Sequence, residues 1–203
     1  IDSEKTGFSS PAQAAITGFL ANAWFLPDEP LLGFVQIPAG PFIMGSNPAL
    51  DRLAYENERW SSNRRQGTVQ IDDFYIGLFE VTAAQFRVFI AEHPDLANEV
   101  PAEIQGDMPI TNVTWPEALA YARWLQQKLE NSSDTPEELR SYLAAGGQVS
   151  IPSEAEWEKA ARGADGRIFP WGNTPSAASA NYGSSAMLPV GSRPVSYTHL
   201  RAH

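Results

Sequence analysis

The chain contains no cysteine and has few basic residues, and both absences narrow what it can do. Without cysteine, its 203 residues form no disulfide, no thiolate metal site and no cysteine nucleophile. Lysine and arginine number 14 against 24 acidic residues, which gives a formal net charge of -10. Because nucleic-acid binding requires clustered cations that neutralise phosphates, we expect no nucleic-acid partner.

The chain also lacks a long apolar run. Its most apolar stretch, Ala12 to Leu26, is interrupted by Gln13, Thr17 and Asn22 and is too short to span a bilayer. We therefore expect no membrane partner. The first residue is Ile1 rather than methionine, which leaves room for a missing start, signal peptide or preceding domain. The compartment stays open, with the cytoplasm slightly favoured.

The length and the turn-forming residues predict one domain flanked by two short segments. A chain of 203 residues that is 43% apolar can bury one sizeable core. Residues 1–30 end in "LPDEP" and are interpreted as a linker or lead-in from a missing N-terminal region. Residues 31–194 form the domain. Residues 195–203, "VSYTHLRAH", are interpreted as a non-native or aberrant tail.

Short strands are predicted early in the domain and irregular structure late in it. Residues 34–37 and 42–44 are apolar and flank a Pro-Ala-Gly-Pro turn, which is typical of two short strands. Further strands are predicted within residues 68–81, which are rich in valine, isoleucine, phenylalanine and tyrosine. Residues 47–67 indicate a long loop, and glycine, proline, serine and asparagine dominate after Gly163.

Four helices are predicted from one repeated signature, a serine or threonine cap with a glutamate or glutamine three residues later. The four pairs are Thr82 with Gln85, Thr114 with Glu117, Thr135 with Glu138, and Ser153 with Glu156. Gly146 and Gly163 stand where left-handed C-terminal caps belong. In the second helix, Ala118, Ala122, Leu125 and Leu129 repeat at helical spacing and predict a face turned to the core.

Three glutamates in "IPSEAEWEKAARG", Glu154, Glu156 and Glu158, form the first candidate site. Paired carboxylates serve as general acid and base in several hydrolases. The capping role of Glu156 and the helix dipole, which favours acids in the first turn, support a structural interpretation instead. In that interpretation Trp157, Ala160 and Ala161 form the buried side, and Glu158 makes an exposed pair with Arg162.

Other candidate ligands are too scattered to predict a metal site. His199 and His203 lie four residues apart but in the C-terminal tail and without a third ligand, and His93 stands alone at a helix end. The acids without the spacing of a calcium loop are interpreted as solvated charges; they are Asp51, Glu56, Glu58, Asp72 and Asp73.

The tryptophans offer either stacking surfaces for a ligand or core packing, and core packing is the more common role. The residues considered are Trp60, Trp115, Trp157 and Trp171. Pro170-Trp171-Gly172 is interpreted first as a structural lock, because proline and glycine fix the backbone on both sides of the ring.

Six blocks together resemble the formylglycine-generating enzyme or sulfatase-modifying factor family. The blocks are "FVQIPAGPFIMGS", "FYIGLFEVTAAQF", "PITNVTWPEALAYARWL", "IPSEAEWEKAARG", "FPWGN" and "AN", in the family's order from about Leu31 to Gly191. The resemblance implies an α+β fold related to C-type lectins, with short strands, about four helices and much ordered loop. It also implies relatives that oxidise a sulfatase cysteine to formylglycine with copper held by two cysteines, and iron-dependent sulfoxide synthases.

Two departures from the family shape the functional expectation. The sequence has no cysteine, and after Pro194 it departs from the glycine- and tryptophan-rich segment that the family usually carries there. We therefore expect a sulfatase-modifying-factor-like domain that lacks the catalytic C-terminal part and is inactive alone, with a sulfatase or other protein or peptide as the substrate of the complete protein. The alternatives are a non-catalytic binding or regulatory module of a multidomain bacterial protein, and part of an iron-dependent relative.

A structural calcium ion is the one family ligand that maps onto this sequence. By resemblance, its ligands are Asn181 of the "AN" block and the backbone carbonyl of Tyr182. The acidic partner that the family supplies downstream is absent from "YGSSAMLPVGS". Copper is expected only for a complete catalytic member, and no catalytic or cofactor-binding residue is assigned here.

Overall fold

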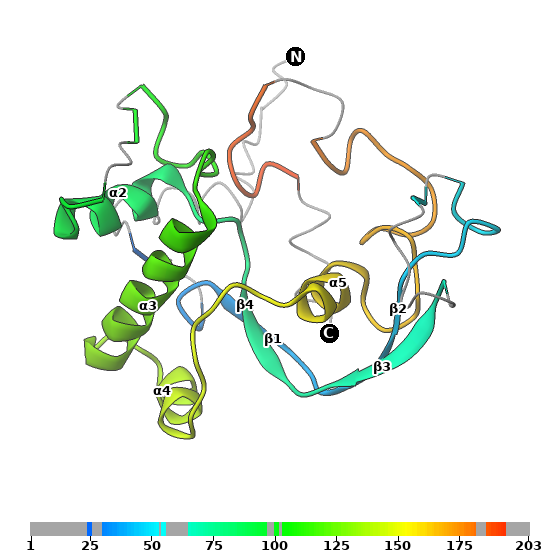
Figure 1. The fold of residues 1–203 in the computed structure, drawn as a ribbon, viewed down its shortest axis with the longest axis horizontal. Coiled ribbons are helices and arrows are strands. Elements are labelled where there is room, and N and C mark those ends of the chain that lie inside the picture. Colours follow the sequence, from blue (N-terminus) through cyan, green and yellow to red (C-terminus); the bar gives the residue numbers. More distant parts are fainter. Residues whose placement is uncertain are drawn as a thin grey trace, which may run out of the picture.

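The computed structural model describes residues 24–25, 30–52, 54–55, 65–96, 100–101, 103–181 and 186–193. Its four short strands form two antiparallel pairs that follow one another as a bent ribbon two strands wide. β1 (Phe34–Ile37) pairs with β4 (Phe74–Gly77), and β2 (Gly40–Met44) pairs with β3 (Gly67–Ile71). Both predicted strand regions are confirmed. The ribbon bends at residues 38–39 and 72–73, between the two pairs, and curves around helix α5 (Figure 1).

The described residues contain four helices at the predicted places. They are α2 (Ala83–Glu92), α3 (Trp115–Asn131), α4 (Glu137–Ala144) and α5 (Glu154–Arg162). The caps at Thr82, Thr114 and Ser153 form the predicted capping boxes, in which the side chain three residues later accepts the cap's own N–H. Gly163 caps α5 with a φ of 73°, as its left-handed position predicted.

The predicted cap of α4 was wrong in its details. Pro136 is the N-cap residue, and no side-chain hydrogen bond caps the helix. Thr135 is buried, and its hydroxyl donates to the Leu129 carbonyl at 2.7 Å. The hydroxyl therefore satisfies a carbonyl in the last turns of α3, which competes successfully with the local cap.

The core consists of three small clusters. In the first, Phe86 and Phe89 of α2 meet Tyr121 and Trp124 of α3, with ring centroids 5.3 to 5.8 Å apart. The second joins Leu32, Leu129 and Leu139, and the third joins Ile37, Phe74 and Ala160. The predicted core-facing side of α3 is confirmed, since Ala122 and Leu129 are buried and Ala118 and Leu125 are half-buried. Tyr121 and Trp124 of the same helix are buried as well.

The N-terminal end of the described chain takes part in the core, and its C-terminal end is irregular. Trp24 and Phe25 contact the second cluster, and Trp24 also contacts the first, so tertiary packing begins before Leu31. Between Gly163 and Arg193 the described residues contain an isolated bridge from Phe169 to Gly172 but no helix or longer strand, which confirms the irregular final third.

None of the helices in the described ranges is long and apolar enough to cross a membrane. The α+β class is confirmed.

Candidate functional site

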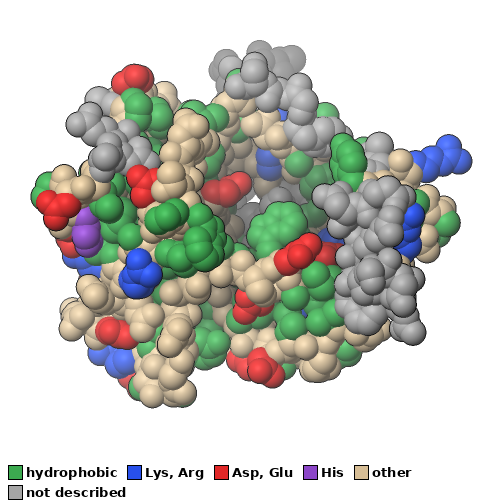
Figure 2. Space-filling model, viewed as in Figure 1, with side chains coloured by type: hydrophobic (Ala, Val, Ile, Leu, Met, Phe, Trp, Pro, Cys, Tyr) green, Lys and Arg blue, Asp and Glu red, His purple; other side chains and the backbone are tan. Residues whose placement is uncertain are grey.

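An apolar groove of about 980 Å³ runs between the ribbon, α3, α5 and the loop after α5. Members of all three core clusters line it, including Phe86, Leu129 and Phe74. Hydrophobic side chains surround the hollow at the centre of the face in Figure 2. At this size the groove lies at the upper end of the range for ligand pockets, so it is the candidate functional site among the described residues.

Trp157 is the most exposed aromatic side chain in the groove lining. It retains 62% of its accessible surface, whereas the sequence interpretation placed it on the buried side of its helix. Ala160 is buried as predicted and Ala161 is half-buried. The prediction for Trp157 was wrong because α5 turns Lys159, Ala160 and Arg162 toward the ribbon, which leaves the indole facing the groove.

Lys159 is buried because its ammonium group has backbone acceptors at the bend of the ribbon. Nζ donates to the Pro38 carbonyl at 2.6 Å and to the Gly40 carbonyl at 3.1 Å. Burial lowers the pKa of Lys159. The aliphatic stem of the side chain covers apolar surface while its head is hydrogen-bonded, so a charged residue occupies the position that an amphipathic pattern assigns to an apolar one.

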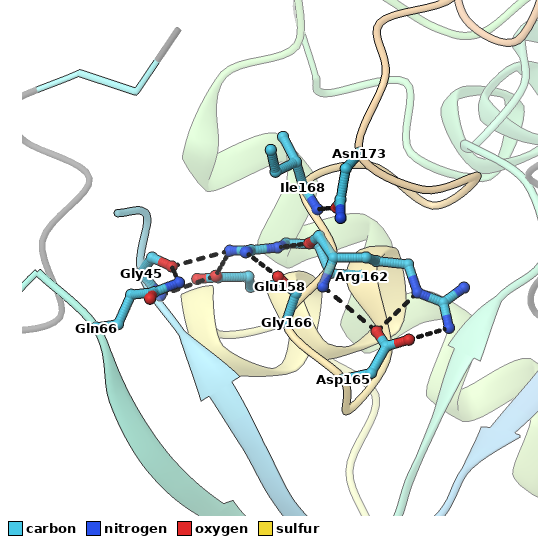
Figure 3. A network of polar contacts seen from close by, with 9 residues as sticks. Gly45, Gln66, Glu158, Arg162, Asp165, Gly166, Ile168 and Asn173 are labelled. Carbon is cyan, nitrogen blue, oxygen red and sulfur yellow. Dashed lines mark hydrogen bonds and ion pairs between the residues drawn. The ribbon is translucent and has the colours of Figure 1, made fainter. Parts of the chain in front are cut away.

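Arg162 ties α5 both to the end of β2 and to the loop that forms one side of the groove (Figure 3). Its guanidinium donates to the Gly45 carbonyl at 3.1 Å, to the Gly166 carbonyl at 3.3 Å and to the Arg167 carbonyl at 2.5 Å. It also forms an ion pair with Glu158. This single side chain therefore holds three separate backbone segments together.

Glu158 belongs to the same buried network. Its carboxylate accepts the Gly45 N–H at 2.9 Å as well as pairing with Arg162, and the two side chains are 14% and 11% exposed. The predicted pair is confirmed, but the prediction that it is exposed was wrong. The spacing of four residues identifies the pair, whereas its burial depends on β2, which is more than 100 residues away in sequence.

The other two glutamates are structural in the way the sequence predicted. Glu156 accepts the Ser153 N–H and hydroxyl, both at 2.7 Å, and Glu154 is exposed in the first turn. Glu158 is engaged in the network of Arg162. Glu156 and Glu158 thus have separate partners, Glu154 is exposed, and the three carboxylates do not form an acid–base pair.

The loop after α5 is locked into the groove by its own contacts. Phe169 and Gly172 exchange backbone hydrogen bonds of 2.8 and 3.0 Å, and Gly172 adopts a φ of 127° that favours glycine. The Trp171 ring stacks on Phe169 at 5.2 Å and 2°, and its N–H donates to the Thr174 carbonyl at 2.8 Å. The interpretation of Pro170-Trp171-Gly172 as a structural lock agrees with this geometry.

Asp165 and Arg167 support the same loop, and Figure 3 shows the hydrogen bonds that Asp165 accepts. Arg167 donates to both carboxylate oxygens of Asp165, at 2.8 and 2.7 Å, and to the Pro170 carbonyl at 3.2 Å. The hydrogen bonds from Arg167 lower the pKa of Asp165 to about 2. Both residues therefore hold the backbone that presents Phe169 and Trp171.

The candidate metal ligands do not assemble a site within the described ranges. No cluster of three or more histidines, aspartates and glutamates suited to a metal ion occurs there. Asn181 is exposed and donates its amide to the Ala186 carbonyl at 2.9 Å, while Tyr182, His199 and His203 lie outside the described residues. Because Tyr182, the other predicted ligand, is among the residues that are not described, the calcium site stays a prediction. Without cysteine, the sequence does not fit the copper of the family.

The remaining candidates that the structure describes are not among the residues that line the groove. His93 caps the end of α2, and its Nδ1 lies 2.9 Å from the Phe89 carbonyl. Trp115 is 68% exposed in the first turn of α3. Asp72 and Asp73 form the bend between β3 and β4. Trp60, Glu56 and Glu58 lie outside the described residues.

Comparison with known proteins identifies the family of this arrangement. A family model described as the sulfatase-modifying factor enzyme 1-like domain matches residues 26–198. The structure of PvdO from Pseudomonas aeruginosa superimposes with a TM-score of 0.57 at 23% identity, over 79% of this chain and 62% of that chain. This likeness shows that the two share a fold.

Three curated relatives cover both active and inactive proteins. Hercynine oxygenase of Mycolicibacterium smegmatis is 32% identical over 79% of this chain and 40% of its own length. From Bos taurus, the formylglycine-generating enzyme is 27% identical over 71% of this chain and 44% of its own. The inactive C-alpha-formylglycine-generating enzyme 2 is 26% identical over 82% of this chain and 62% of its own.

The matches cover most of this chain but a smaller share of each relative. The chain spans 40% to 62% of the length of the three curated relatives, so each of them contains polypeptide that has no counterpart here. The family model, in contrast, matches most of this sequence. The chain therefore belongs to the sulfatase-modifying factor enzyme 1-like domain family.

Proposed function

We propose that the chain is part of a protein that oxidises a cysteine of a sulfatase to formylglycine, with the copper-binding and catalytic residues outside this sequence. The observation that carries the proposal is the family match over residues 26–198 in a chain without cysteine. Similarity to the formylglycine-generating enzyme of Bos taurus supports the reaction. Because this sequence has no cysteine, the proposal assigns the copper ligands to polypeptide outside it.

In this proposal the chain takes no part in bond making and instead forms a surface that orients the polypeptide substrate. The Arg162 network holds the end of β2, α5 and the loop at Gly166 as one unit. That unit carries Trp157 and Trp171 into the groove lining. A rigid aromatic surface of this kind can orient a polypeptide without taking part in bond making.

An aldehyde assay tests where the catalytic residues lie. The purified chain, copper and a synthetic peptide that carries the target cysteine of a sulfatase are incubated in air, and aldehyde is detected with a hydrazide probe. The formylglycine-generating enzyme of Bos taurus serves as the positive control. We expect aldehyde with the control enzyme only. Formation by the chain alone would contradict the assignment of the catalytic residues to polypeptide outside it.

Two other functions have specific support. Similarity to hercynine oxygenase favours an iron-dependent sulfoxide synthase, and similarity to the inactive C-alpha-formylglycine-generating enzyme 2 favours a non-catalytic binding module. Chimeras separate the three. Residues 31–193 replace the matched region in the formylglycine-generating enzyme and in the hercynine oxygenase.

We expect aldehyde formation by the first chimera and no sulfoxide synthesis by the second, provided that both retain cooperative melting. The reverse pattern favours the iron-dependent reaction. Loss of both activities in folded chimeras favours the binding module.

A further inference from the structure

We propose that the groove binds an extended, apolar polypeptide segment, of the kind that the longer family members carry outside the region matched by this chain. The proposal rests on the proposed function in one respect, since it takes the working domain to contain more polypeptide than this sequence.

The division of the core is the first argument. Each of the three clusters contains only three or four buried residues, and all three border the same groove. A domain usually has one contiguous core. Half-buried Trp24 and Leu125 already link the first two clusters, and an apolar segment in the groove would cover the lining that borders all three.

The exposed indole of Trp157 is the second argument. Exposing 62% of a tryptophan on a well-capped helix gives up much of the free energy that burying so large a ring provides. Ala161, one turn after Trp157, also lines the groove, and its small side chain leaves room beside the indole for a chain to pass. Aromatic residues in such positions supply much of the binding energy at protein interfaces.

The chemistry of the lining determines the kind of occupant. Apolar and aromatic side chains dominate it, and its charged members are Glu80, Glu156 and Arg162, of which Arg162 is engaged with Glu158. The continuous stretch from Phe74 to Val81 also lines the groove and includes β4, which belongs to a ribbon of only two strands. Two-stranded ribbons gain stability from a third strand, so an extended segment fits better than a compact ligand.

The relatives supply the source of the occupant. PvdO has the same fold and contains polypeptide beyond the 62% of its chain that is matched here. Overlapping synthetic peptides of about 15 residues, long enough to cross the groove in an extended conformation, that cover all of PvdO are therefore suitable probes. Each peptide is labelled, and its binding to the purified chain is measured by fluorescence anisotropy.

Two matched variants locate the contact. Trp157→Glu places a charge in the groove, whereas Trp115→Glu makes the same change at a tryptophan that is similarly exposed, in the first turn of another capped helix and outside the groove lining. We expect peptides from the unmatched part of PvdO to bind saturably. Trp157→Glu should weaken this binding by at least about tenfold, and Trp115→Glu by less than about twofold.

Three results would overturn the proposal. The first is that no peptide binds saturably. The second is that Trp157→Glu and Trp115→Glu weaken peptide binding equally. The third is that the chain associates with itself and Trp157→Glu abolishes this association, which would make a second copy the occupant. Circular dichroism first establishes that both variants fold. The peptide-binding and aldehyde assays test separate claims. Absence of peptide binding would refute the groove proposal, whereas aldehyde formation by the chain alone would refute the proposed function.

Discussion

The Glu158–Arg162 pair allows a direct test of which residues stabilise α5. In Glu158→Gln the side chain keeps its shape and one carbonyl oxygen, which can still accept the Gly45 N–H. The negative charge opposite Arg162 is lost. Because the Arg162 side chain is only 11% exposed, the substitution leaves a buried cation that keeps hydrogen-bond acceptors, the backbone carbonyls and the amide oxygen of the new side chain, but has no carboxylate opposite it.

The expected cost follows from this geometry. Removing one partner of a buried pair costs about 3–5 kcal/mol, and we expect the lower limit, about 3 kcal/mol, because the carbonyls of Gly45, Gly166 and Arg167 remain. For a protein of this size, that cost lowers the melting temperature by about 6–12 °C. Urea denaturation followed by circular dichroism measures the free energy of unfolding.

Two controls turn the measurement into a comparison within one helix. Glu154→Gln removes an exposed charge from the first turn and should cost at most about 1 kcal/mol. Trp157→Ala should also cost about 1 kcal/mol or less, because the indole is mostly exposed. If Glu158→Gln were within about 0.5 kcal/mol of the wild type while Trp157→Ala cost several kcal/mol, the burial of this pair and the exposure of this indole would both be refuted.

Three further predictions concern separate parts of the fold. Tyr121→Phe should stabilise the chain by about 1 kcal/mol in urea denaturation, since the buried hydroxyl has no hydrogen-bond partner among the described residues; a loss of stability would contradict this. Gly147→Ala should cost about 1–3 kcal/mol, because its Cβ would lie 2.4 Å from the Tyr142 ring; an unchanged melting temperature would contradict it. Asp165, with its pKa lowered from 3.8 to about 2, contributes stability that is present above pH 3.8 and is lost as the pH falls through 2. Asp165→Asn should therefore lose less stability than the wild type over that interval, and equal losses would contradict the assignment.

The sequence predicted the helices well because their starts depend on contacts within three residues. The capping boxes at Thr82, Thr114 and Ser153 each connect a cap to the third residue after it. The prediction failed at Thr135, where a carbonyl six residues earlier accepts the hydroxyl. The local sequence therefore predicts a helix cap correctly unless a group elsewhere in the fold binds the capping hydroxyl.

The groove and its lining could not be predicted, for a related reason. Which side of α5 is buried depends on the carbonyls of Pro38, Gly40 and Gly45, which come from a distant part of the sequence. Those acceptors allow a lysine and an arginine to be buried and leave a tryptophan exposed. A hydrophobicity pattern assigns the opposite arrangement because it considers side chains without their hydrogen-bond partners.

The two sides of α5 consequently separate stability from binding. Glu158, Lys159 and Arg162 attach the helix to the ribbon and to the following loop, whereas Trp157 and Ala161 face the groove. Trp157→Glu should therefore weaken binding of the occupant more than it lowers the free energy of unfolding. Glu158→Gln should instead mainly lower the free energy of unfolding. Because the two positions are adjacent in sequence, a difference between their effects can be attributed to the direction in which each side chain points.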